Sequence, residues 1–283
     1  KNMSKKNQTS RLSIQHKLAK GVLGIFGKNA QIHDLSVKDI SQIVLKELES
    51  VYPELEFRYR KQIFKSEIND KLKKLDSYLG QSLFVKNASI MPDGGIIEVK
   101  DDDNEWRVVL VSEAKYQGKD IDNIESGTLV GKNNNQDLMA AGNAIERSHK
   151  NISEISNYML YEAHFPYVIF LEGSNFLTET IEVKRPDGSV VVLDYSSGML
   201  NRLDRLSAAN YGMPFNVNLC KNRYVSHEDK AVMLQAASMY TTGDGSKWER
   251  TKMLEILLEV AETSMQMLGR DIFKQITEYK RNE

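Results

Sequence analysis

Hydrophobic and polar positions alternate most clearly in the middle of the chain. Residues 96–100 and 106–111 are runs rich in Val and Ile, and the acidic turn 101–104 between them predicts an antiparallel hairpin. The second run continues to Glu113 and Lys115, so these two residues end a strand. Side chains two residues apart on a strand point to the same face, which brings the carboxylate and the ammonium side by side.

This second run is apolar on both faces. Simple alternation places Val109 and Val111 on the face of Glu113, and it places Val108 and Leu110 on the opposite face. A strand that is hydrophobic on two sides is typical of the centre of a covered sheet. We therefore expect a central strand that ends in charged residues.

Helical periodicity and capping signals dominate much of the remaining sequence. The first expected helix ends at Gly27, the second begins at the capping residue Ser36 and stops before Pro53, and Gly269 closes the last one. Helices are predicted over residues 12–26, 36–52, 66–80, 145–159, 199–209, 228–240 and 248–268. For three of them the spacing predicts the buried face: Ile40, Ile43, Val44, Leu48 and Val51 in the second, Ile68, Leu72 and Leu75 in the third, and Ile145, Ser148, Ile152, Ile155 and Met159 in the fourth. Further strand character is found at residues 83–85.

The order of these elements favours an α/β fold. Residues 167–171 form a short buried strand, which we expect to run parallel to the strand ending at Lys115. Residues 116–135 lack periodicity and are too long for a passive connection, so we interpret them as an arm that wraps DNA. Residues 181–193 form a second hairpin, which we expect to be a second protruding, DNA-wrapping arm. The prediction is one domain over residues 12–283, with a central mixed sheet, helices on both faces and a mobile basic arm at residues 1–11.

Composition restricts the class of protein. The chain has 283 residues, of which 41% are hydrophobic and 27% charged, so it can bury a sizeable core. No stretch approaches eighteen uninterrupted apolar residues, which predicts neither a membrane span nor an export signal. The single cysteine, Cys220, cannot form an internal disulfide and fits a reducing cytoplasm.

Charge is distributed unevenly along the chain. The net charge of −1 is not that of a typical nucleic-acid binder. Residues 1–20 nevertheless carry six Lys or Arg and no acidic residue, and residues 57–74 carry seven against two acidic residues. Both stretches are candidate phosphate-binding patches, and the alternative for each is a solvated helix face or tail.

Candidate chemistry gathers around the central hairpin. Pro92 and Asp93 precede its first strand, and nineteen residues separate Asp93 from Glu113 and then Lys115. Carboxylates are the ligands that Mg²⁺ prefers, and the ion keeps several waters and shares a phosphate oxygen of its substrate. A neighbouring lysine would offset charge on the phosphate or orient the attacking water. The pattern indicates a metal-dependent nuclease site.

Short motifs of this kind also arise by chance, and two decoys are present. Residues 98–100 are also Glu-x-Lys, but Glu98 is only five positions after Asp93, which leaves no room for a hairpin. Residues 186–188 repeat the Pro-Asp-Gly turn without a following Glu-x-Lys strand. On the motif alone, an ordinary turn followed by an ion pair at a strand end remains equally open.

A wider similarity decides between these alternatives. The chain strongly resembles the EcoRI family of restriction endonucleases, within the PD-(D/E)xK nuclease superfamily. The similar segments run nearly end to end: residues 15–18, 24–27, 57–60, 92–95, 98–102, 113–115, 136–156, 170–178, 201–214 and 268–271. The resemblance implies a Mg²⁺-dependent homodimer that cleaves both strands of duplex GAATTC, with Asp93, Glu113 and Lys115 as catalytic residues. It also implies a cognate DNA methyltransferase that protects the host DNA.

The resemblance also assigns residues that read the bases. In the family an extended chain lies in the major groove, and the matching positions here are Met139, Ala140, Asn143, Ala144, Glu146 and Arg147, supported by Arg202 and Arg205. Asn and Arg suit purine edges, and small residues allow close backbone and methyl contacts. Spacing alone favours another interpretation, in which Asn143 caps a helix with Glu146 as its capping-box partner. Resemblance reverses that preference.

Two departures from the family lie next to the catalytic motif. Met91 stands before Pro92 where the family has Lys, and Tyr116 follows Lys115 where the family has His. Neither change replaces a metal ligand, so we expect activity to survive with altered phosphate positioning. Two other functions on the same core are kept as alternatives: a structure-specific repair nuclease and a DNA-binding regulator without activity.

Overall fold

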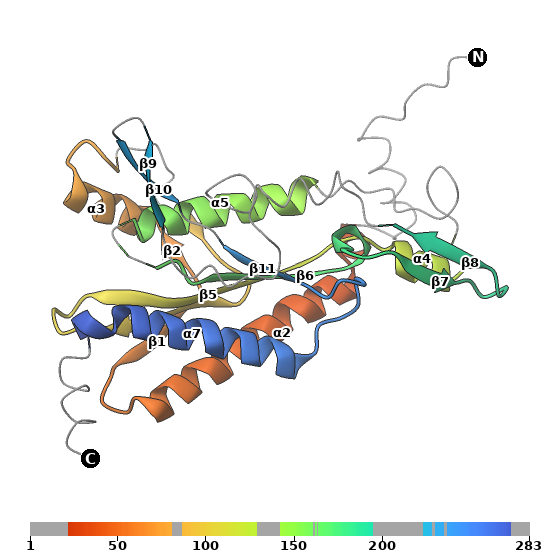
Figure 1. The fold of residues 1–283 in the computed structure, drawn as a ribbon, viewed down its shortest axis with the longest axis horizontal. Helices are drawn as coiled ribbons and strands as arrows, with labels where there is room; N and C mark the ends of the chain where they lie inside the picture. Colours follow the sequence, from red (N-terminus) through yellow and green to blue (C-terminus); the bar gives the residue numbers. More distant parts are fainter. Residues whose placement is uncertain are drawn as a thin grey trace.

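The structure, a computed structural model, describes residues 22–80, 87–128, 142–160, 162, 164–194, 223–227, 230–234 and 237–272. Its centre is a five-stranded sheet with the order β1-β4-β5-β6-β11 (Figure 1). The strands are β1 (Phe57–Arg60), β4 (Gly95–Lys100), β5 (Trp106–Tyr116), β6 (Tyr167–Glu172) and β11 (Ser238–Thr241). The predicted hairpin is confirmed as β4 and β5.

The sheet is mixed, as predicted. β4 pairs antiparallel with both β1 and β5, whereas β6 runs parallel to β5 and β11 runs parallel to β6. β5 is the middle strand and is buried over most of its length. The helix before β6 makes the crossover that a parallel pair needs.

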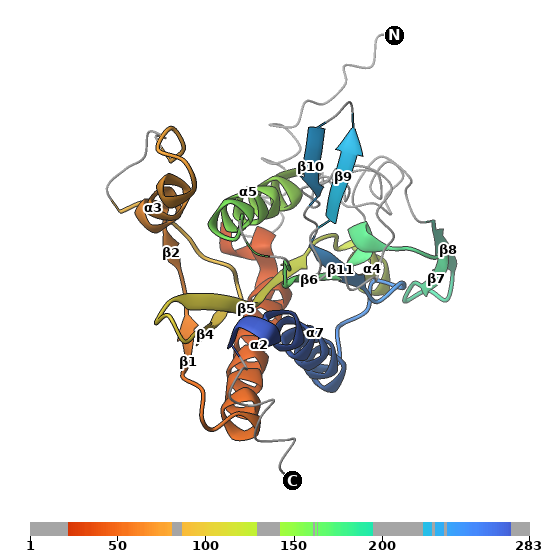
Figure 2. The ribbon, with the colours of Figure 1, turned by 60° about the vertical axis from the view of Figure 1, so that its left-hand side comes forward.

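Helices cover both faces of the sheet (Figures 1 and 2). One face carries α2 (Val22–Val51) and α7 (Arg250–Ile272), and the other carries α3 (Lys65–Leu75) and α5 (Gly142–Tyr158). Each face has its own apolar cluster, one built around Leu257 and Phe170 and the other around Ile155 and Ile169. The predicted two-sided α/β architecture is therefore confirmed.

The alternation predicted for β5 is wrong at one point. Val108 and Val111 pack in the cluster beneath α5, whereas Val109 and Leu110 both pack in the cluster with α2 and α7. The register with β4 shifts at this point, where Ile97 pairs with Leu110 but the next residue pairs with Val108. A β-bulge inserts one residue and so turns successive side chains to the same face.

Glycines at two predicted helix ends do not end their helices. α2 runs without a break through Gly27 and Ser36 to Val51, and α7 continues past Gly269 to Ile272. A glycine inside a helix costs about 1 kcal/mol relative to alanine, which burial of side chains elsewhere on α2, such as Val44, outweighs. α2 does stop before Pro53, as predicted.

Helix faces were predicted with mixed success. On α5, four residues of the expected stripe are buried, Ser148, Ile152, Ile155 and Met159, the last of these just beyond the helix, whereas the side chain of the fifth, Ile145, lies outside the described part. On α2, Val37, Ile40, Val44 and Leu48 are buried, but the predicted Ile43 and Val51 are exposed. On α3, which ends at Leu75 rather than near Gly80, Ile68 is buried and Leu75 is exposed.

The helix predicted over residues 228–240 is wrong. Its described residues lie in strands: β9 (Arg223–His227) pairs antiparallel with β10 (Lys230–Leu234), and β11 adds to the edge of the central sheet. Short apolar segments fit either period, and pairing of β11 with β6 decides the outcome here. The helix predicted at 199–209 and the strand at 83–85 lie outside the described residues.

A small outlying subdomain lies at one end of the sheet. The predicted second hairpin is confirmed as β7 (Ile181–Lys184) and β8 (Val190–Leu193), which extends away from the central sheet in Figure 1. Part of the first predicted arm is instead the helix α4 (Asp120–Glu125), whose Ile124 packs against this hairpin. The remaining short elements are β2 (Ile63–Phe64), β3 (Ser89–Ile90) and η1 (Ser174–Phe176). Within the described part of the chain, every helix is too short or too polar to cross a membrane.

Candidate active site

A tight turn carries Asp93 to the end of β5. The amide of Gly95 donates to the carbonyl of Pro92 at 3.0 Å, and the amide of Gly94 donates to the carbonyl of Ser112 at 2.9 Å. Gly95 has a φ of +82°, and a Cβ on Gly94 would lie 2.1 Å from the Ser112 hydroxyl oxygen. Only glycine fits these two positions, and the turn thereby fastens Asp93 beside β5.

Three charged side chains predicted from the sequence meet at this point. Lys115 Nζ lies 2.5 Å from Asp93 Oδ2 and 2.7 Å from Glu113 Oε1. The side chains of Asp93 and Lys115 are 25% and 17% exposed, whereas that of Glu113 is 1% exposed. Two carboxylates thus share one cation at a place that solvent reaches from one side.

Glu113 is held by neutral donors as well as by the lysine. The Tyr167 hydroxyl donates to Glu113 Oε2, and Asn151 Nδ2 donates to Glu113 Oε1 at 3.2 Å. Burial raises the pKa of Glu113, and the nearby Lys115 ammonium opposes that rise. Burial and the Glu113 carboxylate together raise the pKa of Tyr167, so its hydroxyl keeps its proton.

Lys115 stays charged in this setting. Burial by itself would lower its pKa, but the Glu113 and Asp93 carboxylates outweigh that effect and raise it above the ordinary value. A lysine that holds its proton at neutral pH is a hydrogen-bond donor and a source of positive charge. It does not act as a general base.

The residues fit a divalent metal that brings its own remaining ligands. Asp93 and Glu113 already converge on one cationic nitrogen, which is the arrangement two carboxylates need to share a metal ion. Among the described residues, no group of three or more His, Cys, Asp or Glu side chains is placed to bind a metal. Two carboxylates suit Mg²⁺, which commonly takes its other ligands from water and a phosphate.

Comparison with known proteins supplies the family. The family described as "Restriction endonuclease EcoRI" matches residues 19–275, nearly the whole chain. The chain belongs to the EcoRI family. It is 65% identical over 275 residues to the type II restriction enzyme EcoRI of Escherichia coli, covering 97% of this chain and 99% of that protein. It is 50% identical over 267 residues to the type II restriction enzyme RsrI of Cereibacter sphaeroides, covering 94% and 96%.

Both decoy motifs have structural partners instead. Glu98 is buried and accepts hydrogen bonds from Arg58 Nε at 2.6 Å and from the Tyr158 hydroxyl at 3.1 Å. Lys100 pairs with Glu56 and lies at the turn end of the β4–β5 hairpin, the opposite end from Asp93 and Lys115. The other decoy, around Asp187, is the exposed turn of the β7–β8 hairpin.

Of the eight residues assigned to DNA binding by resemblance to the EcoRI family, four lie in the part of the chain that the structure describes. Asn143, Ala144, Glu146 and Arg147 belong to the first turns of α5, because this helix begins at Gly142. The expected extended chain is therefore wrong for these four positions, whose backbone is helical. Met139, Ala140, Arg202 and Arg205 lie outside the described residues.

Five of the seven basic residues in the stretch 57–74 make contacts within the DNA-free molecule, and its role as a phosphate-binding patch stays a prediction. Arg58 stacks over Trp106 with its guanidinium carbon 4.0 Å from the ring centroid. Arg60 pairs with Glu67 at 2.6 Å, and the ammonium of Lys71 lies 4.0 Å from the centroid of the Tyr158 ring. Lys65 and Lys74 also make ion pairs, with Glu154 and Glu105. Residues 1–20, the other basic stretch, are outside the described part.

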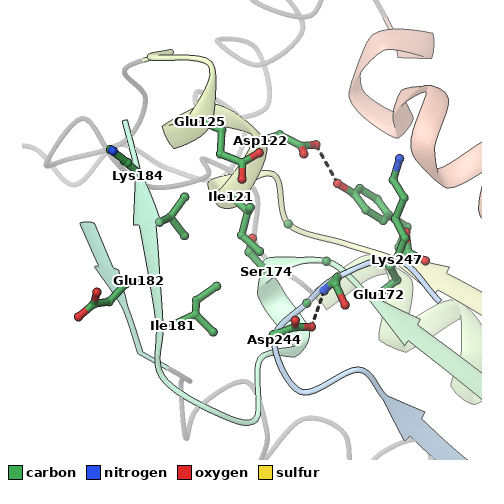
Figure 3. Close-up of a pocket in the computed structure, with 16 residues that line it drawn as sticks. Ile121, Asp122, Glu125, Glu172, Ser174, Ile181, Glu182, Lys184, Asp244 and Lys247 are labelled. Atoms are coloured by element: carbon green, nitrogen blue, oxygen red, sulfur yellow. Dashed lines mark hydrogen bonds between the residues drawn. The ribbon is translucent and has the colours of Figure 1, made fainter. Parts of the chain in front are cut away.

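The two departures from the EcoRI family have different surroundings. Met91 is 62% exposed beside the turn. The Tyr116 hydroxyl donates to Asp122 Oδ2 at 3.0 Å and borders a pocket between α4, β6 and β7 (Figure 3). Among the described residues that line this pocket, five carry carboxylates and two are lysines: Asp122, Glu125, Glu172, Glu182, Asp244, Lys184 and Lys247.

The sequence did not single out two residues that touch Glu113. Tyr167 opens β6, and its polar hydroxyl in an otherwise apolar buried strand was the available signal. Asn151 stands next to Ile152, which belongs to the buried stripe of α5, so the helical period by itself places Asn151 off that stripe, toward the surface. Only the packing of α5 and β6 against β5 brings both to the carboxylate.

Proposed function

We propose that this chain hydrolyses one phosphodiester bond in each strand of duplex GAATTC, with Asp93, Glu113 and Lys115 as its catalytic residues. Membership of the EcoRI family makes it a type II site-specific endonuclease that acts on double-stranded DNA. The observation that carries the assignment of residues is the meeting of two carboxylates and one ammonium at the end of β5.

In this proposal Asp93 and Glu113 hold a Mg²⁺ ion. When bound, the ion polarises the phosphoryl group and lowers the pKa of a coordinated water. Asp93, which is partly exposed, meets the substrate side of the site, and the buried Glu113 holds the ion from the protein side. The partial exposure of Asp93 and Lys115 supports the approach of a phosphate from that direction.

Lys115 supplies a positive charge that does not depend on the metal. In the metal-free protein its raised pKa keeps the ammonium protonated, and its donors are satisfied by Asp93 and Glu113. A metal ion held by the two carboxylates would take the place of the ammonium there. Lys115 would then be free to donate to the phosphate or to the attacking water.

The remaining parts of the proposal concern assembly and recognition. A two-fold homodimer matches a palindrome, since each subunit reads one half. Residues 12–283 form the one folded domain in this proposal, and residues 1–11 are an arm that orders on DNA. A methyltransferase of the same specificity would protect the host DNA, because an unprotected genome would be cut.

Cleavage of a plasmid of known sequence tests the function directly. With Mg²⁺ present we expect fragments whose ends all map to GAATTC, and with a chelator we expect none. Cuts at DNA junctions or lesions rather than at one palindrome would point to a repair nuclease. Binding to the palindrome without any strand breakage would leave only a DNA-binding regulator.

Affinity for the cognate duplex should fall steeply with salt. With six or more phosphate contacts per complex, binding weakens by about 10³-fold or more between about 50 and 200 mM salt, because bound cations are released. Since residues 57–74 are mostly paired internally, we expect the basic arm to contribute to this slope. Filter binding or fluorescence anisotropy across a salt series measures it.

Variants of the basic arm, residues 1–11, test how much it contributes to the salt dependence of DNA affinity. Lys5→Ala combined with Lys6→Ala should reduce the slope by about one for each lost phosphate contact. Lys252→Ala is the matched control, because Lys252 is an exposed lysine on α7 that pairs with Glu255. A flat salt response in the unmodified protein contradicts the proposed backbone footprint.

A further inference from the structure

Two donors from different elements converge on the buried carboxylate of the active site. The Tyr167 hydroxyl, from β6, donates to Glu113 Oε2, and the side-chain amide of Asn151, from α5, donates to Oε1 at 3.2 Å. Lys115 also reaches Oε1, at 2.7 Å. Each oxygen of Glu113 therefore has a fixed neutral donor besides the lysine.

The packing around Tyr167 fixes the position of its hydroxyl. Its side chain is fully buried, and its ring stacks on Phe165 with centroids 5.9 Å apart. In the parallel register of β5 and β6, Tyr167 pairs with Val111, which lies on the Glu113 face of β5. The hydroxyl is thus aimed along that face toward Glu113 by the sheet itself.

We propose that Tyr167 and Asn151 are positioning residues that hold the Glu113 carboxylate in the orientation in which it binds the metal ion. The inference rests on the proposed function, because it takes Glu113 as a metal ligand. When metal and phosphate draw Lys115 away, these two neutral donors remain and keep the carboxylate from turning. Donors of this kind typically change metal affinity by about 10- to 100-fold when they are removed.

The molecule contains its own control for this inference. Tyr158 also donates from a buried hydroxyl to a buried carboxylate, Glu98, at 3.1 Å. Tyr158 and Tyr167 lie in the same apolar cluster. Glu98, however, is paired with Arg58 and Arg60 inside the protein rather than with Asp93 and Lys115. Removing the Tyr158 hydroxyl therefore has a similar structural cost without touching the metal site.

The experiment compares Tyr167→Phe with Tyr158→Phe in the full chain bound to a GAATTC duplex. Ca²⁺ binding is followed by calorimetry, since Ca²⁺ also takes oxygen ligands, and the Mg²⁺ dependence of cleavage is measured separately. For Tyr167→Phe we expect both half-saturating concentrations to rise about 10- to 100-fold, with cleavage largely restored at saturating Mg²⁺. For Tyr158→Phe we expect both values to match the unmodified protein.

Several outcomes would overturn the inference. Unchanged Ca²⁺ binding in Tyr167→Phe does so, and so does an equal loss in Tyr158→Phe, which would mark a general effect on packing. If Tyr167→Phe does not fold, Asn151→Ala takes its place, because Asn151 is only partly buried; unchanged Ca²⁺ binding there also overturns the inference. Asp93→Ala separates failure of the positioning role from failure of the proposed function. If this variant still binds Ca²⁺ as the unmodified protein does, the proposed metal site at Asp93 and Glu113 is wrong.

Discussion

We expect Asp93→Ala and Glu113→Gln each to abolish detectable cleavage of the GAATTC duplex while specific binding in metal-free buffer stays largely intact. Each change removes one of the two carboxylates that converge on Lys115, and with it a ligand for the metal. Metal stabilisation of the transition state is worth several kcal/mol, and each 1.36 kcal/mol is about tenfold in rate. We therefore expect losses of about 10³-fold or more.

The second Pro-Asp-Gly turn provides the matched control. Asp187→Ala removes a carboxylate from an exposed hairpin turn with the same local sequence. It should leave the rate of cleavage unchanged. The measurement is a single-turnover rate with Mg²⁺, together with duplex affinity in a chelator and thermal unfolding of each variant. Retained cleavage in either active-site variant would show that the site is assigned to the wrong residues.

We expect Asn143→Ala and Arg147→Ala to weaken binding to GAATTC far more than binding to random DNA. A lost base contact of this kind costs about 1 to 3 kcal/mol, and a homodimer loses it twice, so about 2 to 6 kcal/mol per complex. The alternative role for Asn143, as a helix cap, predicts about 1 kcal/mol of lost folding stability with unchanged discrimination. α5 begins at Gly142, so Asn143 lies inside the first turn and not at the N-cap position.

Two measurements on Asn143→Ala separate these roles. A lower melting temperature would indicate a helix cap, and a lower ratio of specific to non-specific affinity would indicate base reading. Asn157→Ala is the matched control, since Asn157 is an exposed asparagine near the other end of the same helix. A lower melting temperature with an unchanged affinity ratio would mean that Asn143 stabilises α5 and does not read bases.

Much of the candidate site could be predicted because it depends on local sequence. The Pro92 to Gly95 turn needs glycines at two crowded positions, and the alternating runs on either side of residues 101–104 form a hairpin. Once that hairpin exists, Asp93 must lie near Glu113, because Gly95 pairs with Ser112. The partners of Glu113 could not be predicted in this way, since Asn151 and Tyr167 are far from it in sequence.

The sequence by itself determined the two-sided burial of β5, the buried strand β6 and the buried stripe of α5, because each depends on a pattern within one element. The parallel direction of β6 followed from the helix that precedes it. Tertiary structure alone decided the bulge at Val109, the continuation of α2 through Gly27 and the strands where residues 228–240 were expected to be helical. In these cases two local conformations differ by about 1 kcal/mol or less. Burial of a single large side chain contributes about 1.5 to 3 kcal/mol, so contacts between distant segments choose between them.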